Sequence, residues 1–368
     1  MLMLKKTIAA LSLLSILAAC QNDENPSQPE PKPRQDINLT RAEQEFMDKG
    51  TDFAFRFFDQ VCSTEKEKPN VFVSPLSASL CLSMITNGAT DNTLAEMQNV
   101  LGFPANTFSL DDLNNYNQKL TSALLDLDNT TQLGIANSIW IEEGFKVYDS
   151  FVDVNKKMYD AQVQELDFTS PTAKDVINQW CATQTNNCIK EVIQEIPADA
   201  RMYLINALYF KGIWKSQFDK SATGQDNFTN VDGSQQKVAM MNQTATFNYT
   251  QTDDFSIAEL PYGNEAFSMV ILLPSGDKTL DESLPNLNYE NWKQWSKNMV
   301  GKELQIKLPR FKVEYDKELE EDMIAMGMKD AFDAYKAKFA NMSDAELYIG
   351  LLQQFTYINV DEEGTEAA

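Results

Sequence analysis

The sequence predicts an α+β protein, because helical and strand patterns occupy largely separate parts of the chain. Apolar residues recur at helical spacing early in the chain, as at Phe46, Phe53, Phe57 and Val61. Strand patterns dominate residues 228–273 and return near the end, where side chains alternate. Apolar residues make up 43% of the 368 residues, which is enough for a sizeable core.

Local end signals place the helices. Thr40-Arg-Ala-Glu43 has the pattern of a capping box, so a helix is expected to begin there. Ser74 and Pro75 suit the N-cap and first turn of the next helix, which Gly88 is expected to end. Further helices are predicted over residues 91–101, 109–127, 151–159, 174–188 and 318–326.

Apolar runs and alternation predict the strands. Val71–Val73 is expected to form a short buried strand, and residues 132–142 alternate as a strand does. The apolar run Tyr203–Phe210 is typical of a central strand that is covered on both faces. Residues 304–315 are expected to form one long strand, and residues 353–361 form the last one.

The residue inventory excludes most enzyme chemistries. The net charge of −23 argues against nucleic acid or an anionic membrane surface as a partner. The sequence contains no histidine, so Ser-His-Asp sites, Cys-His sites and histidine-based metal centres are excluded. It has no phosphate-binding glycine loop and no cysteine pair at metal-ligand spacing. The protein is therefore expected not to be an enzyme and to need no metal or cofactor.

The N-terminal residues predict export. Residues 1–19 have the layout of a secretory signal, and their apolar run is short for a membrane span. Leu17-Ala-Ala-Cys20 resembles a bacterial lipobox, which implies lipidation of Cys20; the alternative is an ordinary signal cleaved before a cysteine. Residues 20–38 then form a proline-rich tether. We expect a lipid-anchored protein of the bacterial outer membrane, at the cell surface or in the periplasm.

Four cysteines remain beyond the expected anchor, namely Cys62, Cys81, Cys181 and Cys188. An exported protein meets an oxidising compartment, which permits disulfides. Four cysteines allow three pairings, and the sequence does not choose between them. Cys181 and Cys188 are near enough in sequence to bridge across a turn, but buried free thiols are an equal alternative.

Five stretches, in order, resemble the serpin family. Asn70-Val-Phe-Val-Ser-Pro-Leu-Ser77 is similar to the segment that opens the helix behind the main sheet. Asn206-Ala-Leu-Tyr-Phe-Lys-Gly-Ile-Trp214 is similar to the third strand of that sheet. Leu308-Pro-Arg-Phe311 and Gly327-Met328 also fit. Val360-Asp-Glu-Glu-Gly-Thr-Glu-Ala-Ala368 is similar to the hinge of the reactive-site loop.

The resemblance implies a serpin fold over residues 39–368, with helices packed around a large mixed sheet and smaller antiparallel sheets. It implies an inhibitor of serine endopeptidases, with a papain-like cysteine protease as an alternative target. In this family the protease cleaves a reactive loop, which then inserts into the large sheet as a new strand and traps the protease covalently. The two strands that part match Asn206–Lys211 and Gln353–Asp361.

The resemblance also assigns residues to three regions. The hinge comprises Glu362, Glu363, Gly364, Thr365, Glu366, Ala367 and Ala368. The shutter, a polar cluster under the sheet where the strands part, comprises Asn70, Ser74, Ser77, Asn206 and Gln354. The breach, where insertion starts, comprises Trp214 and Glu362. Gly364 is expected to let the loop fold back, and the small residues after it to enter a packed sheet.

One shutter position departs from the family pattern. Gln354 stands where these proteins often carry a histidine on the fifth strand. Glutamine makes similar hydrogen bonds but does not titrate near neutrality. We therefore expect inhibition without a histidine-dependent pH response. The small hinge residues favour an inhibitor over the alternative, a non-inhibitory serpin that acts as a surface binding protein.

The family pattern continues beyond Ala368, so the chain is expected to lack most of the reactive loop and the C-terminal strands. If the protein itself ended there, it would be a non-functional fragment, which is the second alternative. The residue that selects the target lies in the loop, so the sequence does not identify the protease or the scissile bond. A monomer is expected.

Overall fold

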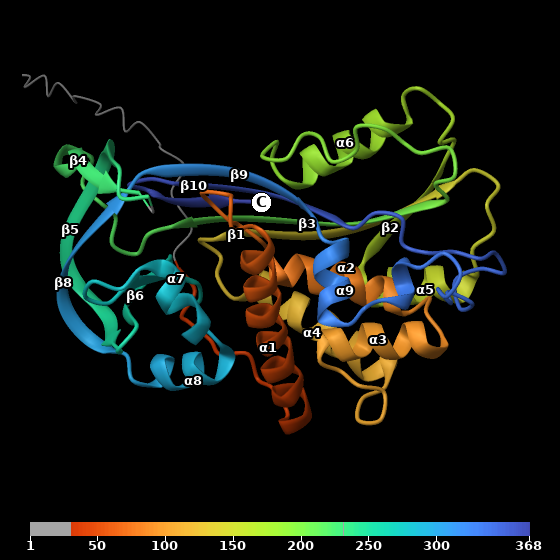
Figure 1. Ribbon diagram of the computed structural model, residues 1–368, viewed down its shortest axis with the longest axis horizontal. Helices are drawn as coiled ribbons and strands as arrows, with labels where there is room; N and C mark the ends of the chain where they lie inside the picture. Colours follow the sequence, from red (N-terminus) through yellow and green to blue (C-terminus); the bar gives the residue numbers. More distant parts are fainter. Residues whose placement is uncertain (1–30, 231) are drawn as a thin grey trace, which may run out of the picture.

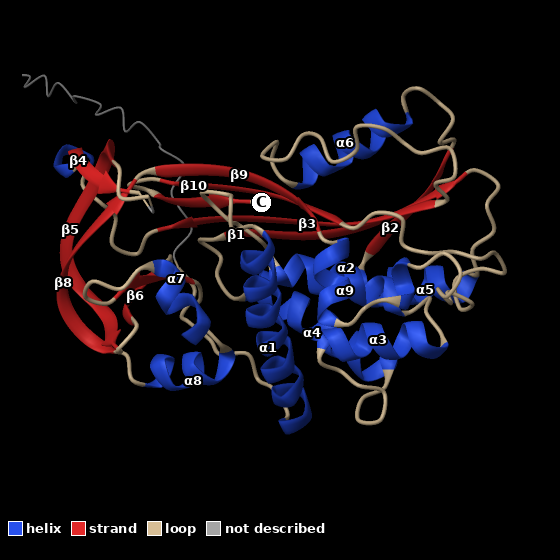
Figure 2. Cartoon of the chain, viewed as in Figure 1, coloured by secondary structure: helices blue, strands red, loops and turns tan. Residues whose placement is uncertain are grey.

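The computed structural model describes residues 31–230 and 232–368 and contains two sheets with helices around them (Figure 2). The helices are α1 (Arg41–Thr64), α2 (Pro75–Thr86), α3 (Asp91–Leu101), α4 (Leu110–Asp126), α5 (Asp149–Tyr159), α6 (Ala173–Gln184), α7 (Leu280–Ser283), α8 (Tyr289–Lys297) and α9 (Glu320–Met326). The strands are β1 (Gln132–Glu142), β2 (Ala161–Leu166), β3 (Met202–Ile213), β4 (Gly224–Thr229), β5 (Gln235–Gln251), β6 (Phe255–Pro261), β7 (Ser268–Pro274), β8 (Val300–Pro309), β9 (Phe311–Glu318), β10 (Gln353–Val360) and β11 (Gly364–Ala367).

Six strands form the large sheet, in the order β2-β1-β3-β11-β10-β9. β1 and β2 run parallel, and every other neighbouring pair is antiparallel, so the sheet is mixed as predicted. The strand predicted over residues 132–142 has the bounds of β1, and the apolar run Tyr203–Phe210 lies within β3. The residues of β10 alternate between half-buried and buried, as the sequence pattern predicts.

The smaller sheet is antiparallel, with the order β4-β5-β6-β7 and with β8 paired to β5. The single strand predicted over residues 304–315 is wrong. Its first part lies in β8 of the smaller sheet and its second part in β9 of the large sheet. The break follows Pro309, the last residue of β8. The Arg310 N–H still donates to the Ala239 carbonyl of the strand beside it at 2.9 Å, and pairing with β10 begins at Phe311.

Helices cover both faces of the large sheet (Figure 1). α2 packs against β3 on one face, next to α1, and α6 packs against β1 and β3 on the other. The main apolar core is on the α2 side and includes Phe53, Phe57 and Leu82. A second core lies where the smaller sheet meets the large one, around Trp214 and Val360.

The capping box predicted at the start of α1 is present. The Thr40 N–H donates to Glu43 Oε2 at 2.7 Å, and the Glu43 N–H donates to Thr40 Oγ1 at 3.3 Å. Hydrogen bonds from Lys119 and from the Thr40 N–H lower the pKa of Glu43 to about 2. Ser74 caps α2 in the same way, by accepting from the Ser77 N–H at 3.3 Å. Short-range signals therefore give correct helix starts.

Besides the strand over residues 304–315, two further predicted elements differ from the structure. Residues Val71–Val73 form no strand; their segment packs under the sheet, where the Phe72 carbonyl accepts from Thr356 Oγ1 at 2.7 Å. α6 ends at Gln184 rather than at residue 188. Asn186 and Asn187 there have φ values of 49° and 62°, which are left-handed and end a helix.

The end of the predicted tether contacts the domain. The Lys32 N–H donates to Asn129 Oδ1 at 2.8 Å, and its Nζ lies 2.6 Å from Asp126 Oδ1. The Lys32 carbonyl also accepts from Asn264 Nδ2 at 3.2 Å. Lys32 is therefore held on the domain surface. The predicted signal residues and Cys20 lie outside the described residues. No helix in residues 31–230 or 232–368 is long and apolar enough to cross a bilayer.

Candidate functional site

β11 occupies the gap between the two strands that the sequence analysis expected to part. It runs antiparallel to β3 and to β10. The register places Thr365 opposite Gly212 of β3. Pairing continues past the strand, because Ala368 and Tyr357 exchange two backbone hydrogen bonds of 2.7 and 2.8 Å. Hinge residues 364–367 therefore lie inside the large sheet, between β3 and β10.

Gly364 is required by space at the point where the chain enters the sheet. A Cβ atom added there would lie 1.9 Å from the Gly212 carbonyl oxygen, which is a backbone atom. The φ of Gly364 is not in the left-handed region. The expected reason for this glycine, a turn that folds the loop back, is therefore replaced by close approach of two backbones.

The inner face of β11 meets an aromatic cluster. Thr365 is 5% exposed, and its hydroxyl accepts a hydrogen bond of 2.6 Å from the Tyr262 hydroxyl. The Tyr262 ring stacks on Trp214, with centroids 4.5 Å apart, and its burial raises the pKa of the phenol. Ala367 packs against the same apolar cluster. Only small side chains fit between this cluster and the strand backbone.

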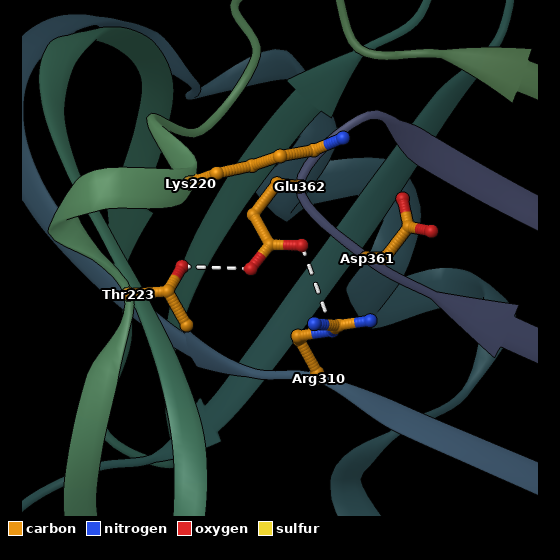
Figure 3. Close-up of a pocket in the computed structure, with 5 residues that line it drawn as sticks. All are labelled: Lys220, Thr223, Arg310, Asp361 and Glu362. Carbon is orange, nitrogen blue, oxygen red and sulfur yellow. Dashed lines mark hydrogen bonds and ion pairs between the residues drawn. The ribbon is translucent and has the colours of Figure 1, made fainter.

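The Glu362 carboxylate is an anchor at the start of the inserted segment. Its side chain is 4% exposed, and Figure 3 shows it between Thr223 and Arg310. Thr223 Oγ1 donates to Glu362 Oε1 at 2.8 Å, and Arg310 Nε lies 3.5 Å from Oε2. The cavity beside these groups has a volume of about 380 Å³, and Lys220 and Asp361 also line it.

Trp214 holds the backbone on both sides of Glu362. Its indole Nε1 donates to the Asp361 carbonyl at 2.9 Å, and its N–H donates to the Glu363 carbonyl at 2.9 Å. The Glu363 carboxylate pairs with Lys220, and this bond raises the pKa of that lysine. The structure thus brings together the two residues assigned to the breach, Trp214 and Glu362.

Gln354 joins β10 to the start of α2. Its Oε1 accepts from the Ser74 N–H at 2.8 Å, and its Nε2 donates to the Ser74 carbonyl at 2.9 Å. Gln354 is 8% exposed in this position. The Ser74 hydroxyl in turn accepts a hydrogen bond from the Ser77 N–H. Three of the residues assigned to the shutter therefore form one connected cluster.

The other two shutter residues lie elsewhere. Asn206 Nδ2 donates to Asn137 Oδ1 at 2.8 Å, and Asn137 Nδ2 donates to the Tyr159 carbonyl at 2.7 Å. This second polar chain ties β3 to β1 and α5. Asn70 is exposed, so it belongs to no buried cluster, contrary to expectation. Its position before the segment that packs under the sheet accounts for this exposure.

The four cysteines within the described residues are free thiols. Cys62, Cys81, Cys181 and Cys188 are all unpaired in the structure, which contains no bridge between Cys181 and Cys188. Burial raises the pKa of Cys81 and of Cys181 to about 12, so both are inert as nucleophiles. No cluster of metal-ligating side chains occurs in the part of the chain that the structure describes.

Several residues of the site carry no signal in the sequence. Thr223 and Tyr262 lie outside every stretch that resembles the family, and Arg310 lies in the stretch Leu308–Phe311 without an assigned role; all three contact the hinge across a long sequence separation. Tyr209 lies within the predicted central strand, but its bond to Glu366 also depends on the position of β11. Only the pairing of β11 with β3 brings these groups to the hinge.

Comparisons with known proteins agree with this geometry. The family model described as "Serpin (serine protease inhibitor)" matches residues 48–368. An uncharacterized serpin-like protein of Methanosarcina acetivorans is 35% identical over 323 residues, which cover 86% of this chain and 74% of that protein. Serpin B6 of Macaca fascicularis is 36% identical over 310 residues, with 81% of each chain covered.

Solved structures confirm the predicted fold class. The thermophilic serpin tengpin in its latent state superimposes with a TM-score of 0.82 at 31% identity, over 90% of this chain and 89% of tengpin. The mixed large sheet, the smaller antiparallel sheet and the surrounding helices are those of that fold. On the family match and these relatives, this chain belongs to the serpin family.

Proposed function

We propose that this serpin inhibits serine endopeptidases and that residues 362–368 are the hinge of its reactive loop. The observation that supports this best is the position of β11 between β3 and β10, bonded to both. A cleaved loop needs such a gap to enter the sheet, and its first residues must be small. Gly364, Thr365 and Ala367 meet that need, because backbone and aromatic groups crowd them.

Insertion of the loop supplies the driving force of the proposed mechanism. Each backbone hydrogen bond contributes about 0.5–1.5 kcal/mol net. A new strand of about ten residues would therefore contribute on the order of ten kcal/mol, comparable to the stability of a whole domain. The protein before cleavage is then held by a kinetic barrier. The protease remains attached to the loop as the loop moves.

The test is addition of a trypsin-like or an elastase-like serine protease to the full-length protein. A covalent complex that survives SDS is the expected product. A nick beyond Ala368 should also raise the melting temperature relative to the intact form. A nicked protein that melts no higher than the intact one would contradict the proposal. The same assay should be run with a papain-like cysteine protease, because the hinge residues do not determine which class of protease is the target.

A non-inhibitory binding protein is the alternative outcome. Clean cleavage by every protease tested, without a trapped complex, would favour it. The small residues Thr365 and Ala367 support the inhibitor, since a bulky or charged hinge is the pattern of members that do not insert.

We also propose that Cys20 is lipidated and anchors the exported protein to the outer membrane. The sequence Leu17-Ala-Ala-Cys20 supports this, together with the tether that reaches the domain at Lys32. Mass spectrometry of the mature protein should show a diacylglyceryl cysteine as the first residue. Cys20→Ser should release the protein from membranes, and an unchanged membrane fraction would contradict the anchor.

A further inference from the structure

The outer face of β11 carries Glu366, which contacts a polar group on β3 and the turn after α6. The Tyr209 hydroxyl donates to Glu366 Oε1 at 2.6 Å. Asn186 Nδ2 donates to the Tyr209 hydroxyl at 3.2 Å and to Glu366 Oε1 at 3.5 Å. Lys211 Nζ lies 3.9 Å from the same oxygen. Tyr209 is 6% exposed, so protein groups rather than bulk water must satisfy its hydroxyl.

The turn after α6 is shaped to reach this carboxylate. Asn186 and Asn187 both adopt left-handed φ values, which asparagine tolerates better than most residues. The Asn187 N–H donates to the Ala182 carbonyl at 2.7 Å and fixes the turn to the end of the helix. α6 itself packs against β1 and β3. The side chain of Asn186 is therefore held over the sheet at the place where β11 lies.

We propose that Tyr209, Asn186 and Lys211 form a receiving site for the glutamate side chain of the inserted strand, and that this site sets the strand's register. The inference rests on the proposed function, because it concerns the strand that inserts. It adds a positioning role for residues that lie outside the hinge, the shutter and the breach.

The composition of β11 explains why a specific side-chain contact is needed to fix its register. Strands of small residues specify their register weakly. A slip of one residue would turn Glu366 towards the buried inner face, where Thr365 now meets Tyr262. A slip of two would bring Gly364 or Ala368 to Tyr209, and neither side chain can accept a hydrogen bond. Among these registers, only the observed one places a carboxylate at Tyr209.

The chemistry of the site favours a planar oxygen acceptor. A hydroxyl donor to a carboxylate forms a strong, short hydrogen bond, and 2.6 Å is in that range. The Lys211 ammonium is about half exposed and farther away, so its contribution is small. We therefore assign the main role to Tyr209 and a supporting one to Asn186.

Hydrogen exchange of the Tyr357 and Ala368 amides tests the register, because these two amides pair only in the observed alignment. Glu366→Ala and Tyr209→Phe should each speed their exchange by about tenfold, the effect of one hydrogen bond to a charged group. Glu366→Gln should stay close to wild type, since its Oε1 still accepts from Tyr209. Asn186→Ala should give a smaller acceleration than Tyr209→Phe.

Cys188 provides a second readout on the same turn. Burial and the nearby Glu366 carboxylate raise the pKa of its thiol to about 11. Loss of the docked side chain in Glu366→Ala should therefore speed alkylation of Cys188 by iodoacetamide. Cys188→Ser should abolish the alkylation signal of this thiol and so identifies it among the signals of the other cysteines.

The matched control is Asp226→Asn, which changes a half-exposed carboxylate of β4 in the smaller sheet that pairs with Lys307 at 2.9 Å. It should leave both readouts unchanged.

Unchanged exchange in both Glu366→Ala and Tyr209→Phe would overturn the inference, as would a Glu366→Gln variant that exchanges as fast as Glu366→Ala. Tyr209→Phe removes a single oxygen, so a folding failure of Glu366→Ala would still leave a decisive variant. Neither readout needs a protease, so failure to trap one would count against the proposed function alone.

Discussion

The hydroxyl of Tyr262 donates a hydrogen bond of 2.6 Å to the hydroxyl of Thr365. Tyr262 follows β6 of the smaller sheet and forms a β-bridge with Trp214, whose ring it stacks on. Thr365 belongs to β11, the strand between β3 and β10. This one bond therefore connects the inserted strand of the large sheet to the residue that follows β6 of the smaller sheet, at a position that is 5% exposed.

Thr365→Arg is expected to expel β11 from the sheet. The substitution would place an unpaired charge at a site that is 5% exposed, at a cost of about 3–5 kcal/mol. The Tyr357 amide should then lose its protection from hydrogen exchange, while the global unfolding transition remains cooperative. Thr365→Ser keeps the hydroxyl and is the control. Wild-type protection in Thr365→Arg would show that the strand tolerates a large side chain there.

Gly364→Ala is expected to destabilise the inserted strand through its backbone. The added Cβ would lie 1.9 Å from the Gly212 carbonyl oxygen, so one strand must shift. We expect a loss of about 1–3 kcal/mol in the free energy of unfolding, the usual cost of overpacking. Gly224→Ala is the matched control, because this strand glycine has open space around it and should change stability by less than about 0.5 kcal/mol. Urea unfolding measures both, and equal effects would refute the steric argument.

Gln354→Ala is expected to lower stability by about 1–3 kcal/mol, because it leaves the Ser74 N–H without its partner and removes one of the two donors to the Ser74 carbonyl. The neighbouring Gln353→Ala changes a half-buried residue on the opposite face of β10 and should have a smaller effect. Thermal or urea unfolding gives the comparison. Equal losses in the two variants would mean that the bonds to Ser74 contribute little.

Gln354→His is expected to introduce a pH dependence that the native protein lacks. A neutral imidazole offers one donor and one acceptor, as the carboxamide does, whereas the protonated ring has no acceptor for the Ser74 N–H. The folded state should therefore hold the pKa of this histidine below its unfolded value of about 6.5. The contribution to stability is then present above that value and lost as the pH falls below it. Unfolding at pH 7.5 and 5.5 should differ more in this variant than in the wild type, and parallel curves would contradict the assignment.

At the Glu362 anchor, Thr223→Val should cost more stability than Arg310→Ala. Thr223 supplies a 2.8 Å hydrogen bond to a carboxylate that is almost fully buried, a contact with a net contribution of about 1.5–3 kcal/mol. Arg310 is about half exposed and 3.5 Å away, so solvent screens its attraction. Denaturant unfolding of both variants tests this order, and the reverse order would show that the ion pair dominates.

Sequence patterns placed many elements correctly because their signals are local. Residues 91–101 and 132–142 have the predicted bounds, since Gly102 takes a left-handed φ after the helix and apolar residues recur along the strand sequence. The strand predicted over residues 304–315 was wrong because the partner strands decide where it changes sheets. Pro309 marks the break, but its position alone does not tell which sheet each half joins.

In the candidate site, too, some groupings are implied by the sequence and others depend on the tertiary structure. Ser74, Gln354, Trp214 and Glu362 fall into two groups close to those that the family resemblance implied. Asn70 is exposed, and the contacts of Glu362, Thr365 and Glu366 come from residues 139, 103 and 157 positions away in sequence. Periodicity and capping describe neighbours along the chain, so they carry no information about such pairs.

By itself, the sequence determined the α+β class, the absence of histidine chemistry and the small residues Gly364, Thr365, Ala367 and Ala368. Only the tertiary structure decided that these residues lie between β3 and β10, that Gly364 serves close approach rather than a turn, and that Glu366 meets Tyr209. The physical reason is that caps and side-chain alternation act over a few residues. Strand pairing joins segments whose order and register depend on the packing of the whole sheet.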